Sequence, residues 1–254
     1  MAAALRLDDV AVRFGGVQAL AGVTFAVEEA DFVGLIGPNG AGKTTLIRIV
    51  AGSLRPDRGR VVIGDVDVAG EGVAARVRRG LALTHQIVRP FRQMTVLDNV
   101  ALAAGHRYTS NPFRALSHVD RAQENGRAAE ILVRVGLAGA ERKLAGSLPL
   151  GQMKRLEVAR ALAVEPKIIL LDEPLAGLNH AEAAAQVETI AEVQRRGVTV
   201  VLVEHNLEQV MRSCRRLIVL NNGQVIGDGA PEEVMADPVV HDAYVGSGTA
   251  HAQA

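Results

Sequence analysis

The chain lacks several features that would direct it to an oxidising or a nucleic-acid environment. Its 254 residues contain a single cysteine, Cys214, so no disulfide can form within the chain. This usage fits a reducing compartment. Cys214 follows Leu207, Val210 and Met211 at helical spacing, and we expect it to be a core thiol. Lys plus Arg and Asp plus Glu number 28 each, and this balance gives no support for a nucleic-acid partner.

Long hydrophobic runs are also absent. The strongest apolar runs, Ile168–Leu171 and Val198–Val203, are far too short to cross a bilayer. They have the right length for strands of a buried parallel sheet. The N-terminus has no basic-then-apolar signal pattern. We therefore expect a soluble chain that acts at a membrane only through a partner.

Glycine, by contrast, is plentiful, and one glycine-rich stretch organises the chain. It fits the phosphate-binding pattern G-x-x-x-x-G-K-[ST] and consists of Gly37, Pro38, Asn39, Gly40, Ala41, Gly42, Lys43, Thr44 and Thr45. An apolar strand precedes it and a helix follows, so backbone N–H groups and a helix dipole would face a phosphate. Lys43 is expected to reach the β- and γ-phosphates and Thr44 to ligate Mg²⁺. The alternative is a glycine-rich turn with a chance lysine.

A second signal is the pair of carboxylates at the end of an apolar strand, Asp172 and Glu173. Ligands of α/β sheets bind at such carboxyl ends. Because side chains alternate along a strand, one carboxylate can hold Mg²⁺ while the other orients the attacking water. This division resembles P-loop ATPases, with Asp172 at the metal and Glu173 as the catalytic group. Solvated charges in an acidic turn are the alternative.

The wider pattern predicts an α/β protein: a P-loop core with a mostly parallel sheet, an N-terminal antiparallel β subdomain and an inserted helical subdomain. Residues Leu5–Val27 alternate as antiparallel strands. The core would comprise residues 1–87 and 166–254, and the helical subdomain residues 88–165. A helical extension is expected over residues 227–246. Further helices are expected over Gly151–Glu165, closed by Pro166, and over Ala181–Arg196, with Asn179 and Glu182 as a possible capping pair.

Four further candidates carry weaker signals on their own. Phe14, one of only seven aromatic residues, could stack on a purine or fill the core. His205 and Gln86 each follow a strand end, where a surface histidine and a loop glutamine are the ordinary interpretations. The segment Ser147–Gln152 opens a helix and could form a second anion site or an ordinary helix start.

Together, in this order, the residues resemble the nucleotide-binding subunit of an ABC transporter. The resemblance implies ATP and Mg²⁺ as cofactors and assigns a role to each motif. Phe14 matches the adenine-stacking aromatic, Gln86 the Q-loop that contributes to the metal site, and His205 the switch histidine. Ser147, Gly151 and Gln152 match the signature, whose family pattern is Leu-Ser-Gly-Gly-Gln. This chain has Leu148-Pro149-Leu150-Gly151-Gln152, with Ser147 one residue out of register. Ala176–Asn179 match the D-loop, and His180 replaces a common proline after it.

Finer motifs resemble the longer ATPase of branched-chain amino-acid importers. They include Phe14–Leu20, Met94–Val100 and Ala176–Asn179. The resemblance implies membrane permease subunits, a second ATPase chain and, indirectly, a substrate-binding protein as partners. It places the chain peripherally on the cytoplasmic face of the inner membrane. ATPases of lipopolysaccharide or urea systems, a regulatory subunit that binds ATP without efficient turnover, and a non-transport ABC ATPase are the alternatives.

A coupling surface is expected between Gln86 and Asn99. Arg89, Pro90, Phe91 and Met94 would line a groove for a helix of the membrane partner, and a locally packed loop is the alternative. The helical insert must pack on the outside of the core. We therefore expect the start of its last helix to complete the ATP site of a second chain.

Overall fold

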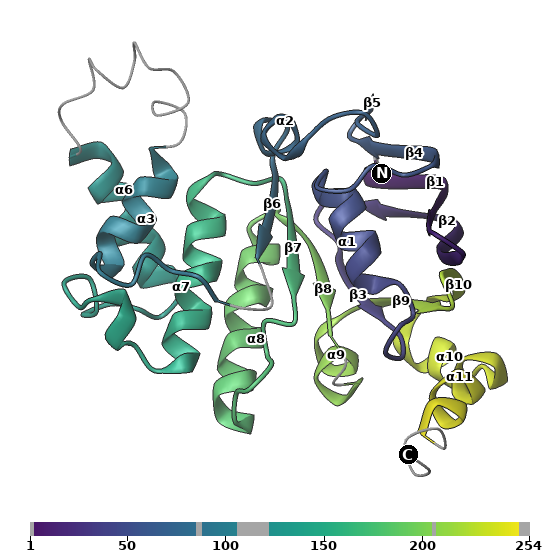
Figure 1. Ribbon diagram of the computed structural model, residues 1–254. Coiled ribbons are helices and arrows are strands. Elements are labelled where there is room, and N and C mark those ends of the chain that lie inside the picture. Colours follow the sequence, from purple (N-terminus) through teal and green to yellow (C-terminus); the bar gives the residue numbers. More distant parts are fainter. Residues whose placement is uncertain (1–2, 85–87, 106–121, 205–206, 249–254) are drawn as a thin grey trace.

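The computed structural model describes residues 3–84, 88–105, 122–204 and 207–248. Two sheets with helices packed against them make up the fold (Figure 1). The strands are β1 (Ala3–Phe14), β2 (Val17–Glu28), β3 (Phe32–Ile36), β4 (Arg58–Ile63), β5 (Val66–Asp67), β6 (Leu81–Thr84), β7 (Ile168–Asp172), β8 (Thr199–Val203), β9 (Arg216–Asn221) and β10 (Gln224–Gly229). The helices are α1 (Lys43–Ala51), α2 (Val73–Arg78), α3 (Val96–Ala104), α6 (Ala122–Arg134), α7 (Leu150–Ala163), α8 (His180–Arg195), α9 (Leu207–Ser213), α10 (Pro231–Ala236) and α11 (Pro238–Gly248), with a short 3₁₀ turn at Ala145–Ser147.

The larger sheet has the strand order β10-β9-β3-β8-β7-β6, and all of its strands except β10 run parallel. Every residue of β3 and β8 is buried, as expected for parallel strands covered on both faces. In the register, Leu35 of β3 and Asp172 of β7 both lie beside Val203 of β8. The carboxyl ends of these three strands are therefore level along one edge of the sheet.

The smaller sheet is antiparallel, with the order β2-β1-β4-β5. Its apolar face packs on α1, and Leu5 and Leu7 share a buried cluster with Leu46 and Ile49 of that helix. Figure 1 shows α1 between the two sheets. The helix that follows the glycine loop is thus held from both sides.

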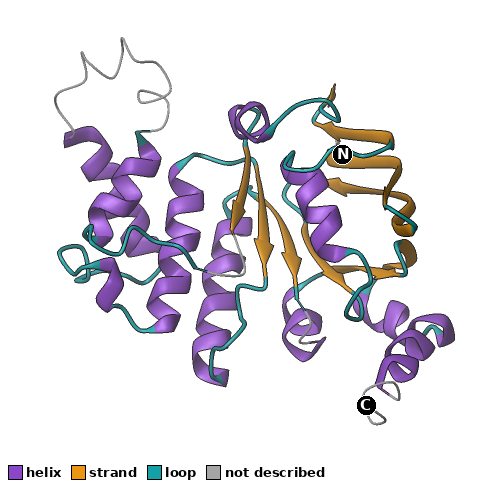
Figure 2. Cartoon of the chain, in the orientation of Figure 1, coloured by secondary structure: helices purple, strands orange, loops and turns teal. Residues whose placement is uncertain are grey.

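The helices α3, α6 and α7 pack against one another at the β6 edge of the larger sheet (left in Figure 2). Their shared hydrophobic core contains Val100, Leu132 and Leu156, and the same cluster includes buried residues on one face of the larger sheet. At the other edge, α10 and α11 pack on the β9–β10 hairpin, with Val234 and Val240 buried.

The predicted α/β fold with an antiparallel N-terminal sheet is confirmed, and so are several local details. Asn179 and Glu182 form a reciprocal capping box at the start of α8, and Cys214 is buried. Two element predictions need correction. Helix α2 was not predicted, and α7 ends at Ala163 instead of the predicted Glu165, because Glu165 takes a left-handed backbone with φ 54°.

Candidate active site

The loop between β3 and α1 has the backbone shape that a phosphate cradle needs. Gly37, Gly40 and Gly42 have φ values of 153°, 80° and 105°. A Cβ atom on Gly37 would lie 2.1 Å from the carbonyl oxygen of Leu220, and one on Gly42 would lie 2.7 Å from that of Ala19. Only glycine fits these two positions, so the glycine spacing follows from the close approach of β9 and β2.

The N-terminus of α1 is open to an anion. No side chain caps it, and its first turn contains no acidic residue. Its N–H groups and its dipole therefore favour a negative ligand in the loop. Of the expected metal ligands, Thr44 is exposed beside this opening.

Lys43, the first residue of α1, lies across the glycine loop. Its Nζ donates to the carbonyl oxygens of Gly37 at 2.6 Å and Pro38 at 3.0 Å. Burial lowers the pKa of Lys43, and the nearby charges of Glu173 and Asp172 act in the opposite direction. The two carboxylates are thus within electrostatic reach of the loop lysine, as the strand register implies.

The carboxylate pair lies at the edge of the sheet that carries the loop. Asp172 ends β7, and the N–H of Glu173 donates to the carbonyl oxygen of Val203 at 2.9 Å. Neighbouring strands lie roughly 4.8 Å apart, so the ends of β3 and β7 are about 10 Å apart, a span that a phosphate with its cation can bridge.

The donor atoms at this edge fit Mg²⁺. Thr44 offers a hydroxyl oxygen and Asp172 a carboxylate oxygen, and Mg²⁺ is usually bound by one or two carboxylates together with substrate phosphates. Among the described residues no group of three or more His, Cys, Asp or Glu could hold a metal ion. Phosphate oxygens and water would complete the coordination.

The segment Ser147–Gln152 forms a second open helix start. Pro149 precedes α7 without any side-chain cap, and the first turn has no acidic residue. The Ser147 hydroxyl donates to the carbonyl oxygen of Leu144 at 2.8 Å, so in this conformation its proton is not directed to a ligand. Gly151 is buried, and a Cβ there would lie 3.1 Å from Oε1 of Glu182.

The comparisons with known proteins agree with this geometry. The family described as ABC transporter matches residues 20–176. The high-affinity branched-chain amino acid transport ATP-binding protein LivG of Salmonella typhimurium is 37% identical over 248 residues, which cover 95% of this chain and 97% of that protein.

This chain belongs to the ABC transporter family.

Solved structures and a second relative place it among the ATPase cassettes of that family. The ADP conformation of the cassette MJ1267 has a TM-score of 0.86 and 33% identity, covering 97% of this chain and 99% of that one. A dimeric cassette, MJ0796 with ADP and Pi, has a TM-score of 0.77 and 25% identity, covering 89% and 98%. The lipopolysaccharide export ATP-binding protein LptB of Acidithiobacillus ferridurans is 35% identical, covering 88% and 89%.

Three further residues of this ABC cassette were predicted to belong to the nucleotide site: Phe14, Gln86 and His205. Phe14 ends β1 and is 46% exposed, so it is not a core aromatic. It is near the loop, because β2 pairs with it at Val17 and contacts Gly42 through Ala19. Gln86 and His205, the expected Q-loop and switch residues, lie outside the described residues.

Two residues that were not predicted as site residues also contact the motifs of the cassette. Lys154 of α7 donates to the backbone of Glu173, and Tyr244 of α11 forms a hydrogen bond with the backbone of Gly37. Burial raises the pKa of Tyr244 to about 12, and the hydrogen bond with the backbone of Gly37 acts in the opposite direction. A lysine at a core position of the Gly151–Glu165 segment was the only local signal for the first contact.

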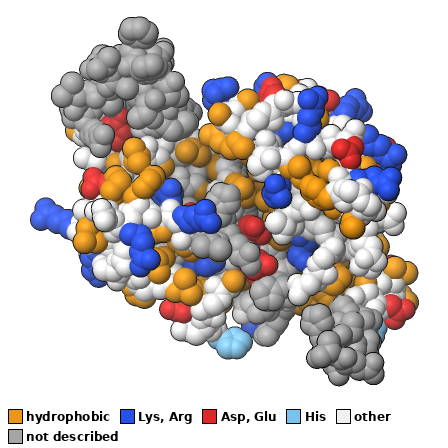
Figure 3. Space-filling model, in the orientation of Figure 1, with side chains coloured by type: hydrophobic (Ala, Val, Ile, Leu, Met, Phe, Trp, Pro, Cys, Tyr) orange, Lys and Arg blue, Asp and Glu red, His pale blue; other side chains and the backbone are white. Residues whose placement is uncertain are grey.

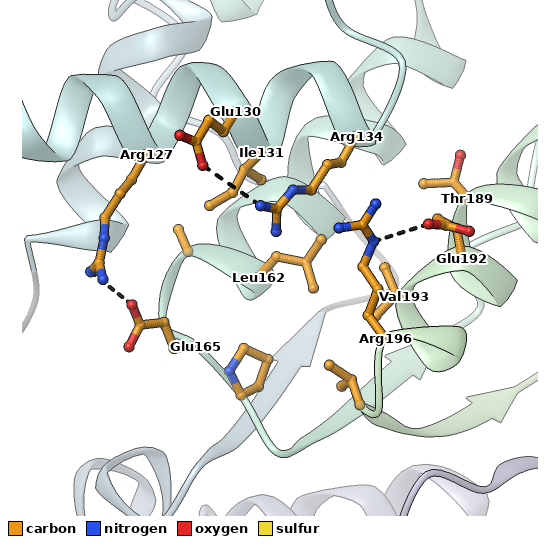
Figure 4. Close-up of a pocket in the computed structure, with 13 residues that line it drawn as sticks. Arg127, Glu130, Ile131, Arg134, Leu162, Glu165, Thr189, Glu192, Val193 and Arg196 are labelled. Carbon is orange, nitrogen blue, oxygen red and sulfur yellow. Dashed lines mark hydrogen bonds and ion pairs between the residues drawn. The ribbon is translucent and has the colours of Figure 1, made fainter.

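A pocket of about 360 Å³ lies elsewhere in the cassette, between α6, the end of α7 and α8 (Figure 4). Its apolar floor includes Ile131 and Val193, and the Arg127–Glu165 ion pair crosses its rim at 2.7 Å. Pro166 and Val198, which precede β7 and β8, also line it. The pocket is therefore at the amino-terminal edge of the sheet, opposite the P-loop, and it is not the nucleotide site.

Proposed function

We propose that this chain is the ATP-hydrolysing subunit of an importer for branched-chain amino acids. The similarity to LivG, which extends over nearly the full length of both chains, carries this proposal. The P-loop and the carboxylate pair at one edge of the sheet supply the chemistry it requires.

Each site residue has a role in this proposal. Phe14 stacks on the adenine, the loop Gly37–Thr45 binds the phosphates, and Lys43 neutralises their charge. Thr44 and Asp172 hold Mg²⁺, with Gln86 contributing from the Q-loop. Glu173 orients the attacking water, and His205 contacts the γ-phosphate.

The signature segment acts on the nucleotide of a second chain, either an identical copy or a paralogous ATPase. The signature segment begins α7, a helix that packs at the β6 edge of the larger sheet. In that sheet β6 is three strands away from β3, which carries the P-loop. The helix start is open, as an anion site needs to be. Because Pro149 stands at the usual serine position, backbone N–H groups would make the contact, with Gly151 and Gln152 nearest to it.

The helical subdomain, residues 88–165, carries the surface for the membrane permease. Phe91 is 49% exposed although its backbone is held firmly, since the Asn99 side chain bonds both its N–H and its carbonyl oxygen. Its ring lies 5.4 Å from the Arg160 guanidinium. Val133, Leu144 and Leu150 are exposed on the same subdomain, and Figure 3 shows hydrophobic side chains over this part of the molecule.

The chain would bind the membrane as a peripheral subunit, on the cytoplasmic face. None of the helices that the structure describes has the length and apolar character needed to cross a bilayer. Attachment would then depend on permease subunits, and a substrate-binding protein would act on their other side.

An ATPase for lipopolysaccharide transport is the second candidate, because of the similarity to LptB over 88% of the chain. Reconstitution separates the two. The chain is co-purified with its membrane partners in lipid vesicles, and ATP hydrolysis is measured with the binding protein plus leucine, isoleucine or valine. Stimulation by these amino acids is expected. Stimulation by lipopolysaccharide alone would overturn the importer proposal, and no hydrolysis in any assembly would favour a regulatory subunit.

A further inference from the structure

Lys154 is a buried lysine on α7 that contacts Glu173, the residue after β7. Lys154 is only 5% exposed, and its Nζ donates to the backbone carbonyl oxygen of Glu173 at 2.9 Å. Burial lowers the pKa of Lys154, and the charges of Glu204, Glu173 and Asp172 oppose this shift. A buried ammonium is costly unless it is paired and hydrogen-bonded, and these carboxylates supply the compensation.

The peptide that Lys154 touches has an unusual backbone. Glu173 has φ 48°, in the left-handed region, which costs about 1 kcal/mol or more for a residue with a Cβ atom. Such a conformation persists only where the surroundings hold it. Here the N–H of Glu173 donates to Val203 of β8, while its carbonyl oxygen accepts from Lys154. The direction of the Glu173 side chain therefore depends on both β8 and α7.

The uncapped N-terminus of α7, which is proposed above to contact the nucleotide of a second chain, lies on the same helix as Lys154. Lys154 is four residues after Leu150, a rise of about 6 Å along one stiff turn. A displacement of the α7 start is therefore transmitted to the Lys154 ammonium with little loss. The hydrogen bond to Glu173 would change with it.

We propose that Lys154 is a positioning residue that links the placement of α7 to the orientation of Glu173. Lys154 holds the Glu173 peptide in its left-handed conformation, so the placement of the α7 start on a nucleotide across the dimer sets the direction of the carboxylate toward the attacking water. This inference rests on the proposed function, in which Glu173 is the catalytic carboxylate.

The first test compares steady-state hydrolysis of MgATP by full-length variants. Lys154→Met removes the ammonium at similar volume and is expected to lower kcat by roughly 10- to 100-fold, the cost of misplacing a catalytic group. KM should stay within about twofold, because the Lys154 ammonium bonds the backbone of Glu173, whereas the proposed phosphate contacts belong to Lys43 and its loop. Arg155→Met is the matched control, since the Arg155 guanidinium reaches Gly136 on the helical side, and its kcat should not change.

The deciding test is a double-mutant cycle with Glu173→Gln, followed by single-turnover hydrolysis. If Lys154 acts through Glu173, adding Lys154→Met to Glu173→Gln should cause no further loss. Equal losses in both backgrounds, or an unchanged kcat in the single variant, would overturn the inference. Normal hydrolysis by Glu173→Gln alone would instead overturn the proposed site. Should Lys154→Met fail to fold, Lys154→Arg keeps the charge and donors, and its smaller loss should likewise vanish beside Glu173→Gln.

Discussion

Two lysines face the same pair of carboxylates from opposite sides of the site. Lys43 is held by the carbonyl oxygens of Gly37 and Pro38, and Lys154 by that of Glu173. The charges of Glu173 and Asp172 counteract the lowering of both lysine pKa values by burial. The carboxylate pair is therefore a shared electrostatic partner of both lysines.

Replacement of Lys43 tests the loop assignment. Lys43→Ala removes the cation that would bond the phosphates, and a charged hydrogen bond contributes about 1.5–3 kcal/mol. We expect MgATP to bind roughly 10- to 100-fold more weakly, measured by fluorescent-nucleotide titration, and hydrolysis to disappear. Arg48→Ala, on the exposed side of α1, is the control and should bind normally. Unchanged turnover of the Lys43 variant would contradict the assignment.

The buried Cys214 thiol makes stability depend on alkaline pH. Burial raises its pKa from 9.0 to about 12. Above pH 9 the unfolded chain therefore loses this proton while the folded chain keeps it, and unfolding becomes easier as pH rises. The free energy of unfolding should fall by up to about 1.4 kcal/mol per pH unit, as urea titrations between pH 8 and 10 can measure.

Cys214→Ala supplies the comparison for that measurement. The variant has no thiol to ionise, so its loss of stability between pH 9 and 10 should be much smaller than that of the parent chain. Tyr244, whose pKa burial also raises to about 12, should contribute only above pH 10. Equal slopes for the two proteins below pH 10 would show that another group is responsible.

At the scale of elements, the two ends of α1 are built for different tasks. Its N-terminus is open to an anion, whereas its C-terminus is closed by Gly52 and by the fully buried Arg76 of α2. The Arg76 guanidinium donates to the carbonyl oxygens of Ile49 and Val50, and also to Val68 and Glu71. A cation at this end complements the negative pole of the helix dipole.

Loss of Arg76 should therefore destabilise the P-loop helix. Arg76→Met leaves several buried carbonyl groups without their donor, at about 1–3 kcal/mol for each group that finds no replacement. We expect the free energy of unfolding to fall by roughly 3 kcal/mol or more, measured in urea. Arg78→Met, at an exposed position of the same helix, should change it by less than about 0.5 kcal/mol. Similar losses in both variants would argue against the capping role.

At the scale of the molecule, the elements that would surround one ATP are divided between two regions. The P-loop and the carboxylates share one edge of the larger sheet, whereas α7 belongs to the helical subdomain and its start lies beside α8, with Gly151 next to Glu182. The isolated chain should therefore be a weak ATPase whose specific activity rises with protein concentration. ATP itself would hold two chains together until it is hydrolysed.

Glu173→Gln traps this state if the arrangement is right. It keeps the side-chain shape and removes the charge, so hydrolysis should fall by about 10²- to 10⁴-fold while ATP still binds. Size-exclusion chromatography with light scattering should then show a shift from monomer to dimer on addition of MgATP. A protein that remains monomeric with saturating MgATP, both alone and with the paralogous ATPase, would refute the shared site.

A negative charge introduced at Gly151 tests whether the start of α7 faces the γ-phosphate of the second chain. Gly151→Asp in the Glu173→Gln background would place a carboxylate against the γ-phosphate and should block the shift to dimer. It would also approach Glu182, so Gly151→Ala, which adds bulk without charge, measures the steric part. Gly126→Asp adds the same charge at an open position of α6 and should leave the dimer intact.

Elements whose cause is local could be predicted from the amino-acid sequence alone. The glycine loop, the capping box of Asn179 and Glu182, and the apolar strands each depend on residues a few positions apart, so their patterns are visible in one dimension. The alternation of sheet and helical segments likewise predicted the fold class. The helix α2 was not predicted, because its one buried side chain is an arginine and a hydrophobic pattern does not include arginine.

Contacts between groups that are distant in the sequence could be identified only from the folded structure. Lys154 bonds Glu173 across 19 residues, Arg76 bonds Ile49 across 27, and Tyr244 reaches Gly37 from the far end of the chain. It also showed that the Ser147 hydroxyl bonds Leu144 and that Phe14 is exposed. These contacts depend on which strands are neighbours in the sheet and on how the helices pack over it. A polar side chain takes its partner from that packing, and its own neighbours in the sequence do not encode the choice.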